Sequence, residues 1–274
     1  MEINKSLDER EFVIINVGAN TRHRGLVSPL WENGVFCFMP IPEEGMLPDP
    51  SKDLFPGCPN LPSFADFVKP QIAFCVHEKY LTKTVHEDPE FETFTYGDNP
   101  DGRARGKAAN LKKHLSNGDL LFFFAGLTAV RGHELIGDYR FYFVAFFEIS
   151  SILPKVTAMP TQDQLTLFGR NAHIRRGQAD PGFFNGFWVW KGSDNSQLFR
   201  KAILFDRELG AKILVSRSGA PYSWPTEKTD VQLLGSRARA SRQVTSRQGK
   251  RVILEHVIDA GNDVPLFRRL LELV

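Results

Sequence analysis

The stretch NGDLLFFFAGL, residues 117–127, restricts the possible folds more than any other part of the chain. Its five apolar residues from Leu120 to Phe124 leave no polar side chain on either face of a strand. The preceding Gly118-Asp119 pair is typical of a tight turn, because glycine accepts unusual backbone angles and aspartate hydrogen-bonds its own backbone. A strand that is apolar on both faces must be covered on both faces. The stretch therefore predicts a curled sheet covered by a second layer, or another kind of buried hairpin.

A helix and a second strand are predicted on either side of this stretch. GKAANLKKHLSNGD predicts a helix over about 106–115, with a lysine-rich exposed face. After the polar loop 128–138, YRFYFVAFFEISSIL predicts a strand long enough to pair with the first in a broad hairpin. We therefore expect residues 110–152 to form a helix followed by a hairpin of the curled sheet.

The whole chain, 1–274, predicts a single α+β domain, because it contains no clear linker and no internal repeat. The charged residues 1–11 predict a frayed or weakly helical N-terminus. Further strands are expected at 12–17, 34–44 (stopped by two prolines) and 186–192, and a short strand or helix start at 71–78. Helices are expected at 162–176 (broken at Gly169), 195–206 and 265–274. An ordered proline-rich loop is expected at 45–70 and a basic loop at 236–251.

Composition narrows the class of protein. Hydrophobic residues make up 42% and charged residues 24% of the chain, which is typical of a globular protein with a sizeable core. The three cysteines, Cys37, Cys58 and Cys75, form no Cys-x-x-Cys pair, so we expect neither a zinc ribbon nor a disulfide framework. This cysteine usage favours a reducing, cytoplasmic location. Neither a secretory signal nor a membrane span is expected.

Several common enzyme motifs do not occur in the sequence. It contains no P-loop, no Rossmann glycine fingerprint, no Gly-x-Ser-x-Gly and no His-Glu-x-x-His. These absences argue against a P-loop ATPase, an NAD-binding Rossmann fold, a serine hydrolase and a zincin. No motif identifies a cofactor.

Two resemblances point toward nucleotides. LSNGDLLFFFAGL and YRFYFVAFFEIS resemble the strand pair of the PUA-like barrel, found in EVE, ASCH and YTH domains, over about 110–152. That resemblance implies a curled, mostly antiparallel β-barrel with flanking helices and long loops. VGANTRHRG, PIPEE, HEDPEFETFTYGD and NAHIRR resemble the third type of nucleotide-modification-associated domain, over about 12–205. The family is inferred to act with modified bases, so the resemblance implies a nucleic-acid or nucleotide partner.

The segment NTRHRG places Arg22, His23 and Arg24 at the end of a predicted buried strand. Loops at strand ends commonly carry functional sites, because the strands hold them rigidly. Two guanidinium groups beside an imidazole suit a phosphate. The alternative is a solvated turn.

The segment HEDPEFETFTYGD, residues 86–98, is dense in titratable groups. His86, Asp88 and Asp98 could serve as acid or base. Gly97 allows a close backbone approach, and Tyr96 offers a stacking face and a hydroxyl. His86 and Asp88 have no partner at a diagnostic zinc spacing, so no metal site is predicted. An acidic surface loop is the alternative.

The segment GRNAHIRRG contains Asn171, His173, Arg175 and Arg176. In one arrangement His173 acts as acid or base while Asn171 contacts a base edge and Arg175 a phosphate. The alternative is the end of a helix, where cations complement the helix dipole.

The segment FFNGFWVWKG places Trp188 and Trp190 on one face of a strand, with Phe187 and Val189 on the other. Two such indoles could form one wall of a cage around a flipped base. Core packing is the favoured alternative, since large aromatic residues are usually buried.

The basic segment 236–251 carries Arg237, Arg239 and Arg242 and contains no acidic residue. In a chain whose net charge is only +2, this local charge suits contact with a phosphate backbone. A solvated loop is the alternative.

Two functions follow from these motifs. The first is a nucleic-acid-binding protein that recognises or processes a modified base in a pocket. The second is an enzyme that modifies or cleaves nucleotides through histidine and aspartate acid–base chemistry. The proposed catalytic residues are His23, His86, Asp88, Asp98 and His173, and the proposed base or phosphate contacts are Arg22, Arg24, Tyr96, Asn171, Arg175, Trp188, Trp190, Arg237, Arg239 and Arg242.

Overall fold

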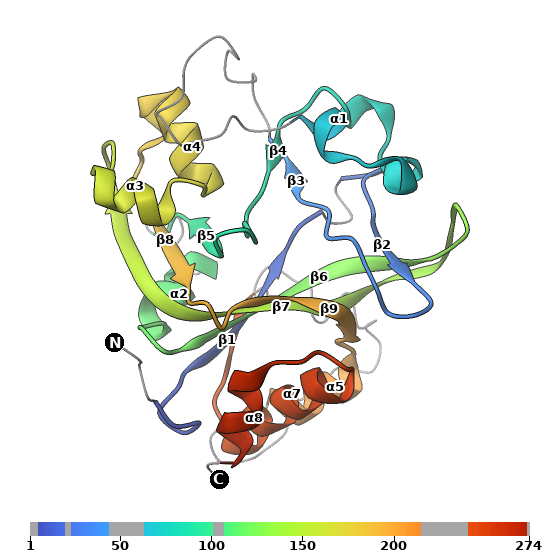
Figure 1. The fold of residues 1–274 in the computed structure, drawn as a ribbon, viewed down its shortest axis with the longest axis vertical. Helices are drawn as coiled ribbons and strands as arrows, with labels where there is room; N and C mark the ends of the chain where they lie inside the picture. Colours follow the sequence, from blue (N-terminus) through green and yellow to red (C-terminus); the bar gives the residue numbers. More distant parts are fainter. Residues whose placement is uncertain (1–4, 20–22, 44–62, 101–106, 215–240, 273–274) are drawn as a thin grey trace.

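The structure, a computed structural model, describes residues 5–19, 23–43, 63–100, 107–214 and 241–272 (Figure 1). The strands are β1 (Phe12–Val17), β2 (Ser28–Trp31), β3 (Ile41–Pro42), β4 (Val85–His86), β5 (Thr95–Asp98), β6 (Leu120–Arg131), β7 (Glu134–Val156), β8 (Phe187–Gly192), β9 (Gln197–Leu204) and β10 (Ser241–Val244). The α-helices are α1 (Phe64–Phe67), α2 (Lys107–His114), α3 (Gln162–Phe168), α4 (Ala172–Ala179), α5 (Arg207–Ile213), α7 (Arg247–Asp259) and α8 (Pro265–Glu272). The 3₁₀ helices are η1 (Pro70–Cys75), η2 (Glu78–Tyr80) and η3 (Pro181–Phe183).

One large sheet organises the described residues. Its strand order is β10-β1-β6-β7-β8-β5, with β2 also beside β6 and β9 also beside β7. β6 pairs in parallel with β1 and β2, and the other pairings in this sheet are antiparallel. The mixed α+β class with a mostly antiparallel sheet is therefore confirmed.

The expected closed barrel is not found among the described residues. β7 curls strongly along its 23 residues (Figure 1), and its pairing with β8 shifts register between Ile149 and Ser151 and again between Leu153 and Val156. Such bulges bend a strand. After these bends, β7 pairs with β8, and β8 pairs with β5. Because β5 and β10 lie at opposite ends of the strand order, the described sheet is curled but open.

The doubly apolar strand β6 is covered on both faces, as its sequence predicts. Leu120, Phe122 and Phe124 belong to a core shared with α5, α7 and α8, which lie together on one side of the sheet (Figure 1). Leu121 and Phe123 belong to a second core on the other face, which includes apolar residues of α2. Alternation along the strand sends successive side chains to opposite cores, because neighbouring residues of a strand point to opposite faces.

Two smaller cores flank the second face. One gathers apolar residues of α1, η1, η2 and β4, including Phe64 and Val85. The other packs α3 and α4 against the end of β7 and against β8, through residues such as Ile174 and Val189. β4 and α4 therefore bring two rigid supports toward β5, the terminal strand of the large sheet (Figure 1).

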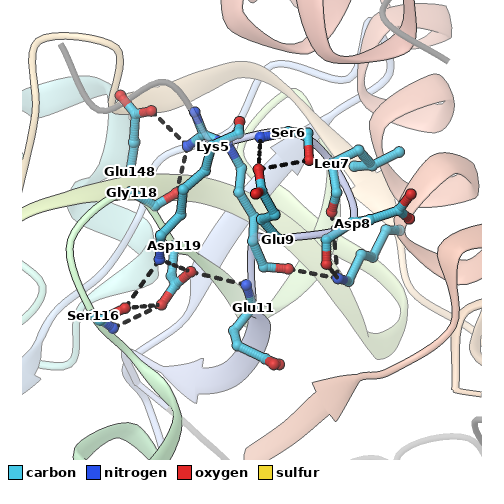
Figure 2. Close-up of polar contacts among 12 residues, drawn as sticks. Lys5, Ser6, Leu7, Asp8, Glu9, Glu11, Ser116, Gly118, Asp119 and Glu148 are labelled. Atoms are coloured by element: carbon cyan, nitrogen blue, oxygen red, sulfur yellow. Dashed lines mark hydrogen bonds and ion pairs between the residues drawn. The ribbon is translucent and has the colours of Figure 1, made fainter.

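The N-terminus is not frayed over residues 5–10. The Arg10 guanidinium, 3% exposed, donates to Gly118 O and, at 2.6 Å, to Glu148 Oε1. Lys5 Nζ lies 2.8 Å from Asp119 Oδ1, as Figure 2 shows. The prediction of fraying was wrong because the charges of this segment are paired with β6 and β7 rather than hydrated.

Two further segments differ from their prediction. Residues 197–204 form β9 and not a helix, because they pair with the edge of β7, with Tyr142 opposite Leu204. This pairing outweighs the helix propensity of the segment.

The described part of the basic segment is not a loop: residues 241–244 form β10 and α7 begins at Arg247. Lys250 lies inside this helix, and its ammonium donates to the backbone oxygen of Arg10 at 2.5 Å.

The strand expected over 34–44 is mostly irregular. Ile41–Pro42 form the short strand β3, and Phe36 makes only an isolated bridge with Leu30 of β2. The predictions of β1, α2, β8, α8 and the helix break at Gly169 are confirmed. None of the described helices is long and apolar enough to cross a membrane.

Candidate functional site

The site is assembled from the two polar motifs HEDPEFETFTYGD and NAHIRR. His86 ends β4, Asp88 follows it, and His173 lies in the first turn of α4. β3 holds β4 through the pairing of Ile41 with His86. The chain then returns through β5, which pairs with β8. Segments far apart in the sequence thus place two imidazoles and a carboxylate together.

Asp88 is the centre of this cluster. Its Oδ1 accepts a 2.7 Å hydrogen bond from Gly97 N and a longer, 3.4 Å bond from Asn171 Nδ2. Its Oδ2 faces both imidazoles, 3.3 Å from His173 Nε2 and 3.9 Å from His86 Nε2. One oxygen therefore anchors the residue to the fold, and the other is directed at the histidines.

The two histidine rings lie edge to face, with their centroids 5.0 Å apart. His86 is buried, and its Nδ1 lies 2.6 Å from Glu43 Oε1. The other carboxylate oxygen of Glu43 lies 3.3 Å from Arg176 Nη1. Glu43 thus fixes the orientation of the His86 ring and leaves its Nε2 directed toward Asp88.

Asn171 and Gly97 hold His173 close to the sheet. Asn171 is fully buried and caps α4, its Oδ1 accepting from His173 N at 3.0 Å. A Cβ on Gly97 would lie 2.6 Å from His173 Cδ2 and 2.8 Å from Asn171 Oδ1. Only glycine allows this close approach of α4 to β5.

Acidic groups dominate the electrostatics of the cluster. The His173 side chain is 23% exposed. Burial lowers the pKa of His173, but its hydrogen bond to Asp88 and the charges of Asp88, Asp98 and Glu43 outweigh that effect and raise the pKa. Burial raises the pKa of Glu43, yet the hydrogen bond with His86 and the nearby cations leave that pKa below its ordinary value. The site therefore favours positive charge.

Among the residues that the structure describes, His86, Asp88 and His173 could hold a metal ion. One ligand atom from each lies within 4.8 Å of the other two. The sequence predicted no metal here because His86 and Asp88 lack a third ligand at a diagnostic spacing. That third ligand comes from α4, a distant part of the chain.

Tyr96 and Asn171 do not present the surfaces expected of base contacts. Tyr96 is buried, its hydroxyl donates to Asp98 Oδ2 at 3.1 Å, and its ring packs against Phe123 and Trp190. Burial raises the pKa of this hydroxyl well above its ordinary value. The buried Asn171 side chain is engaged as a cap. Asn171 is thus at a helix end, but at the N-terminus of α4 and not at the end where cations complement the helix dipole. The buried Tyr96 has no open stacking face.

The two tryptophans lie on one face of β8, as predicted, with ring centroids 6.1 Å apart. Trp190 is fully buried in the core beneath α2, so core packing describes it and the cage interpretation was wrong for this residue. Trp188 is half-buried, and the ammonium of Lys112 lies 5.1 Å from its ring centroid.

The predicted cations are dispersed. Arg175 of α4 is buried and its Nη2 lies 2.9 Å from Glu87 Oε2, so it forms an ion pair with the segment that follows β4. The half-buried His23 and exposed Arg24 belong to a turn that packs against η2, where the Tyr80 hydroxyl donates to Arg24 O at 3.3 Å. Arg242 lies in β10, opposite Ile14. Arg22, Arg237 and Arg239 lie outside the described residues.

Sequence reasoning missed Glu43 as part of the cluster, whereas Arg176 and Gly97 were noted within their motifs without their contacts being predicted. Glu43 belongs to PIPEE, one of the segments that carry the family resemblance, but it contains no local sign of its contact with His86. The TYGD segment did suggest a close backbone approach at Gly97, and α4 is the element that makes it.

Together, the curled sheet and the His–Asp–His cluster define an α+β protein with one half-buried polar centre beside β5. A family model described as nucleotide modification associated domain 3 matches residues 11–247. Since that match covers most of the chain, the chain belongs to this family, as its sequence motifs predicted. No curated protein and no solved structure matches the chain.

Proposed function

We propose that the chain binds a nucleotide, free or within nucleic acid, at the cluster of His86, Asp88 and His173, and that it recognises a modified base there. Membership of a nucleotide modification associated family supports a nucleotide as the ligand. The curled β6–β7 hairpin, which carries the PUA-like resemblance, supports a role in nucleic-acid binding.

The observation that carries the proposal is the convergence of the two polar motifs around Asp88. Its carboxylate contacts β5 through Gly97 and α4 through both Asn171 and His173. Burying so many ionisable groups is costly, and hydrophobic residues would stabilise a purely structural contact better. Imidazole and carboxylate groups are also donors and acceptors suited to the edge of a base.

Two arginines beside the cluster suit the phosphate of such a ligand. Arg176, 29% exposed, pairs with Glu43 and stacks on Phe183, with its guanidinium 3.8 Å from the ring centroid. Arg170 lies between α3 and α4, is partly exposed and pairs with Glu92. Exposed guanidinium groups can exchange a carboxylate partner for a phosphate.

The test is fluorescence anisotropy of the full chain with modified and unmodified oligonucleotides, single- and double-stranded, at low and moderate salt. We expect binding that weakens with salt and is tighter for a modified base. His173→Ala should weaken binding about 10-fold or more, the cost of about 1.4 kcal/mol in contacts. His133→Ala, at an exposed histidine outside the cluster, should bind as the unaltered chain does. The absence of binding at low salt would overturn the proposal.

A second candidate function is catalysis on that nucleotide. Four of the predicted catalytic residues meet in this region, since His86 and His173 face Asp88 and the charge of Asp98 acts on His173. Paired imidazole and carboxylate groups are typical of proton transfer. Mass spectrometry of nucleosides, nucleotides and oligonucleotides incubated with the chain would identify a product. Unchanged turnover in Asp88→Asn and His173→Ala would eliminate this candidate.

A further inference from the structure

Three potential ligand atoms face a common point between β4, β5 and α4. They are His86 Nε2, Asp88 Oδ2 and His173 Nε2, all within 4.8 Å of one another. Atoms that share one ion at about 2.1 Å lie about 3.0 to 3.4 Å apart in octahedral or tetrahedral geometry. The 3.3 Å separation of His173 Nε2 from Asp88 Oδ2 already has this value. The 3.9 Å separation of His86 Nε2 from Asp88 Oδ2 requires only a small contraction.

We propose that His86, Asp88 and His173 bind one divalent transition-metal ion. Two imidazoles and one carboxylate favour borderline ions such as Zn²⁺, Mn²⁺ or Fe²⁺ over Mg²⁺ and Ca²⁺, which prefer oxygen ligands. Three protein ligands leave coordination positions for water or for an oxygen of a ligand. The inference goes beyond the proposed function and does not depend on it, because metal binding is measured without a nucleotide.

The hydrogen bonding of His86 is the strongest argument for a cation. Its Nδ1 lies 2.6 Å from Glu43 Oε1, which requires a proton on that nitrogen. In the neutral ring the Nε2 then carries a lone pair, and this lone pair faces the Asp88 carboxylate. Two acceptors directed at each other are unfavourable unless a proton or a metal ion lies between them. One metal ion satisfies His86, Asp88 and His173 at once, whereas protons alone do so only if both imidazoles carry a proton on Nε2.

The contacts around the three residues are those that commonly orient metal ligands. Glu43 contacts the remote nitrogen of His86, as outer carboxylates do for metal-bound imidazoles. Gly97 N and Asn171 Nδ2 contact Asp88 Oδ1, which leaves Oδ2 directed at the proposed ion. Asn171 also holds the backbone of His173 at the start of α4. Each proposed ligand is thus oriented by neighbouring residues of the fold before any ion binds.

Metal binding is tested on the full chain after treatment with a chelator and dialysis. Isothermal titration calorimetry with Zn²⁺, Mn²⁺ and Mg²⁺ should give one site per chain for the transition metals and binding at least about 100-fold weaker for Mg²⁺. Elemental analysis of the reloaded chain should find one ion, and Co²⁺ should give visible absorption bands typical of nitrogen and oxygen ligands. Mg²⁺ binding as tight as Zn²⁺ binding, or no transition-metal binding at all, would overturn the proposal.

Variants locate the ion. Asp88→Asn keeps an oxygen for Gly97 and Asn171 but replaces the charged ligand, so Zn²⁺ affinity should fall about 100-fold or more. Glu43→Gln, which alters the contacts to His86 and Arg176 but removes no proposed ligand atom, should weaken Zn²⁺ binding about 10- to 100-fold. His133→Ala is the matched control, because it removes an exposed histidine away from the cluster.

Circular dichroism of each variant checks that the chain has folded. If Asp88→Asn does not fold, the variants Glu43→Gln and His86→Gln test the same site. Both variants should bind metal more weakly, and His86→Gln should also change the Co²⁺ spectrum. Unchanged affinity in the folded cluster variants would overturn the proposal. A loss in His133→Ala equal to that in Asp88→Asn would place the ion elsewhere and would overturn it as well.

Discussion

Among the residues that the structure describes, the N-terminal network of Figure 2 and the His–Asp–His cluster are partly buried ionic clusters of opposite character. In the network, both oxygens of Asp119 accept bonds from two groups each, Lys5 and Glu11 N on one and the backbone and hydroxyl of Ser116 on the other. In the cluster, by contrast, Asp88 Oδ2 lies 3.3 Å from His173 Nε2 but 3.9 Å from His86 Nε2, and the second distance is too long for a hydrogen bond. Complete pairing is typical of a structural network, and incomplete pairing is typical of a binding site.

Glu148 extends the contrast. One of its oxygens pairs with Arg10, and the other accepts 2.7 Å bonds from both Ser193 and Asn195. This network joins the N-terminal segment, the turn before β6 and the β8–β9 turn. Its partners lie on separate elements, as do those of the cluster, so distance along the chain does not distinguish the two. The distinguishing feature is whether each polar atom has a partner within the fold.

The largest predicted effect is on the free energy of unfolding. Replacing a carboxylate of the N-terminal network should lower it far more than replacing the carboxylate of the His–Asp–His cluster. Glu148→Ala removes the carboxylate that pairs with the buried Arg10 guanidinium and should lower the free energy of unfolding by about 3–5 kcal/mol. Asp88→Asn retains an acceptor for Gly97 N and should change the free energy by less than about 1 kcal/mol.

Urea denaturation followed by circular dichroism measures both values. Glu134→Ala, at an exposed carboxylate at the start of β7, is the control and should alter stability by no more than about 0.5 kcal/mol. If Asp88→Asn destabilised the chain as much as Glu148→Ala does, the cluster would be a second structural network.

A smaller effect is expected at the contact between β5 and α4. Gly97→Ala places a Cβ 2.6 Å from the His173 ring, and the resulting displacement should cost about 1–3 kcal/mol of stability. It should also weaken Zn²⁺ binding, because His173 and Asp88 would no longer share a common point. Thermal unfolding and calorimetry measure the two effects.

The control for this substitution is Gly182→Ala in the exposed η3 turn. The nearest atom there is a carboxylate oxygen of Asp180 at 3.2 Å, which can rotate away. Metal binding should be unaffected by that change. Full Zn²⁺ affinity in Gly97→Ala would contradict the close packing described for β5 and α4.

The sequence predicted which strand is buried on both faces better than it predicted which distant segments pair with each other. Leu120 to Phe124 required cover on both faces, and two separate cores provide it. The helix break at Gly169 and the strand at 187–192 also follow from local patterns. Residues 197–204 were assigned to a helix because their pairing with β7 depends on a distant strand that no local pattern encodes.

The candidate site was predicted in part for the same reason. His86, Asp88 and His173 were selected as polar residues within dense motifs, and the fold brings them together. The contact between Glu43 and His86 depends on the β3–β4 pairing, and so it was missed. Tyr96 and Trp190 were assigned to base contacts from residue type, yet burial in the core decides their environment.

The smallest predicted effect is the pH dependence of the stability that Glu148 contributes to the N-terminal network. Burial raises the pKa of Glu148, but the hydrogen bonds from Asn195, Ser193 and Arg10 and the Arg10 charge outweigh burial and lower the pKa. A carboxyl whose folded pKa lies below its unfolded value stabilises the fold above the unfolded pKa, and this stability is lost as the pH falls through the folded pKa. Glu148 should therefore stabilise the chain fully at neutral pH and progressively less below its ordinary pKa of 4.5.

Urea denaturation of the unaltered chain and of Glu148→Gln, from neutral pH to about pH 3, measures this contribution. The stability difference between the two should shrink with acidification, because the glutamine cannot lose a charge. Glu32→Gln, at an exposed carboxylate paired with Arg131, is the control and should show a difference of less than about 0.5 kcal/mol at every pH. A difference between the unaltered chain and Glu148→Gln that stays constant with pH would mean that the Glu148 charge does not stabilise the network. In that case hydrogen-bond geometry alone would hold residues 5–10 against the sheet.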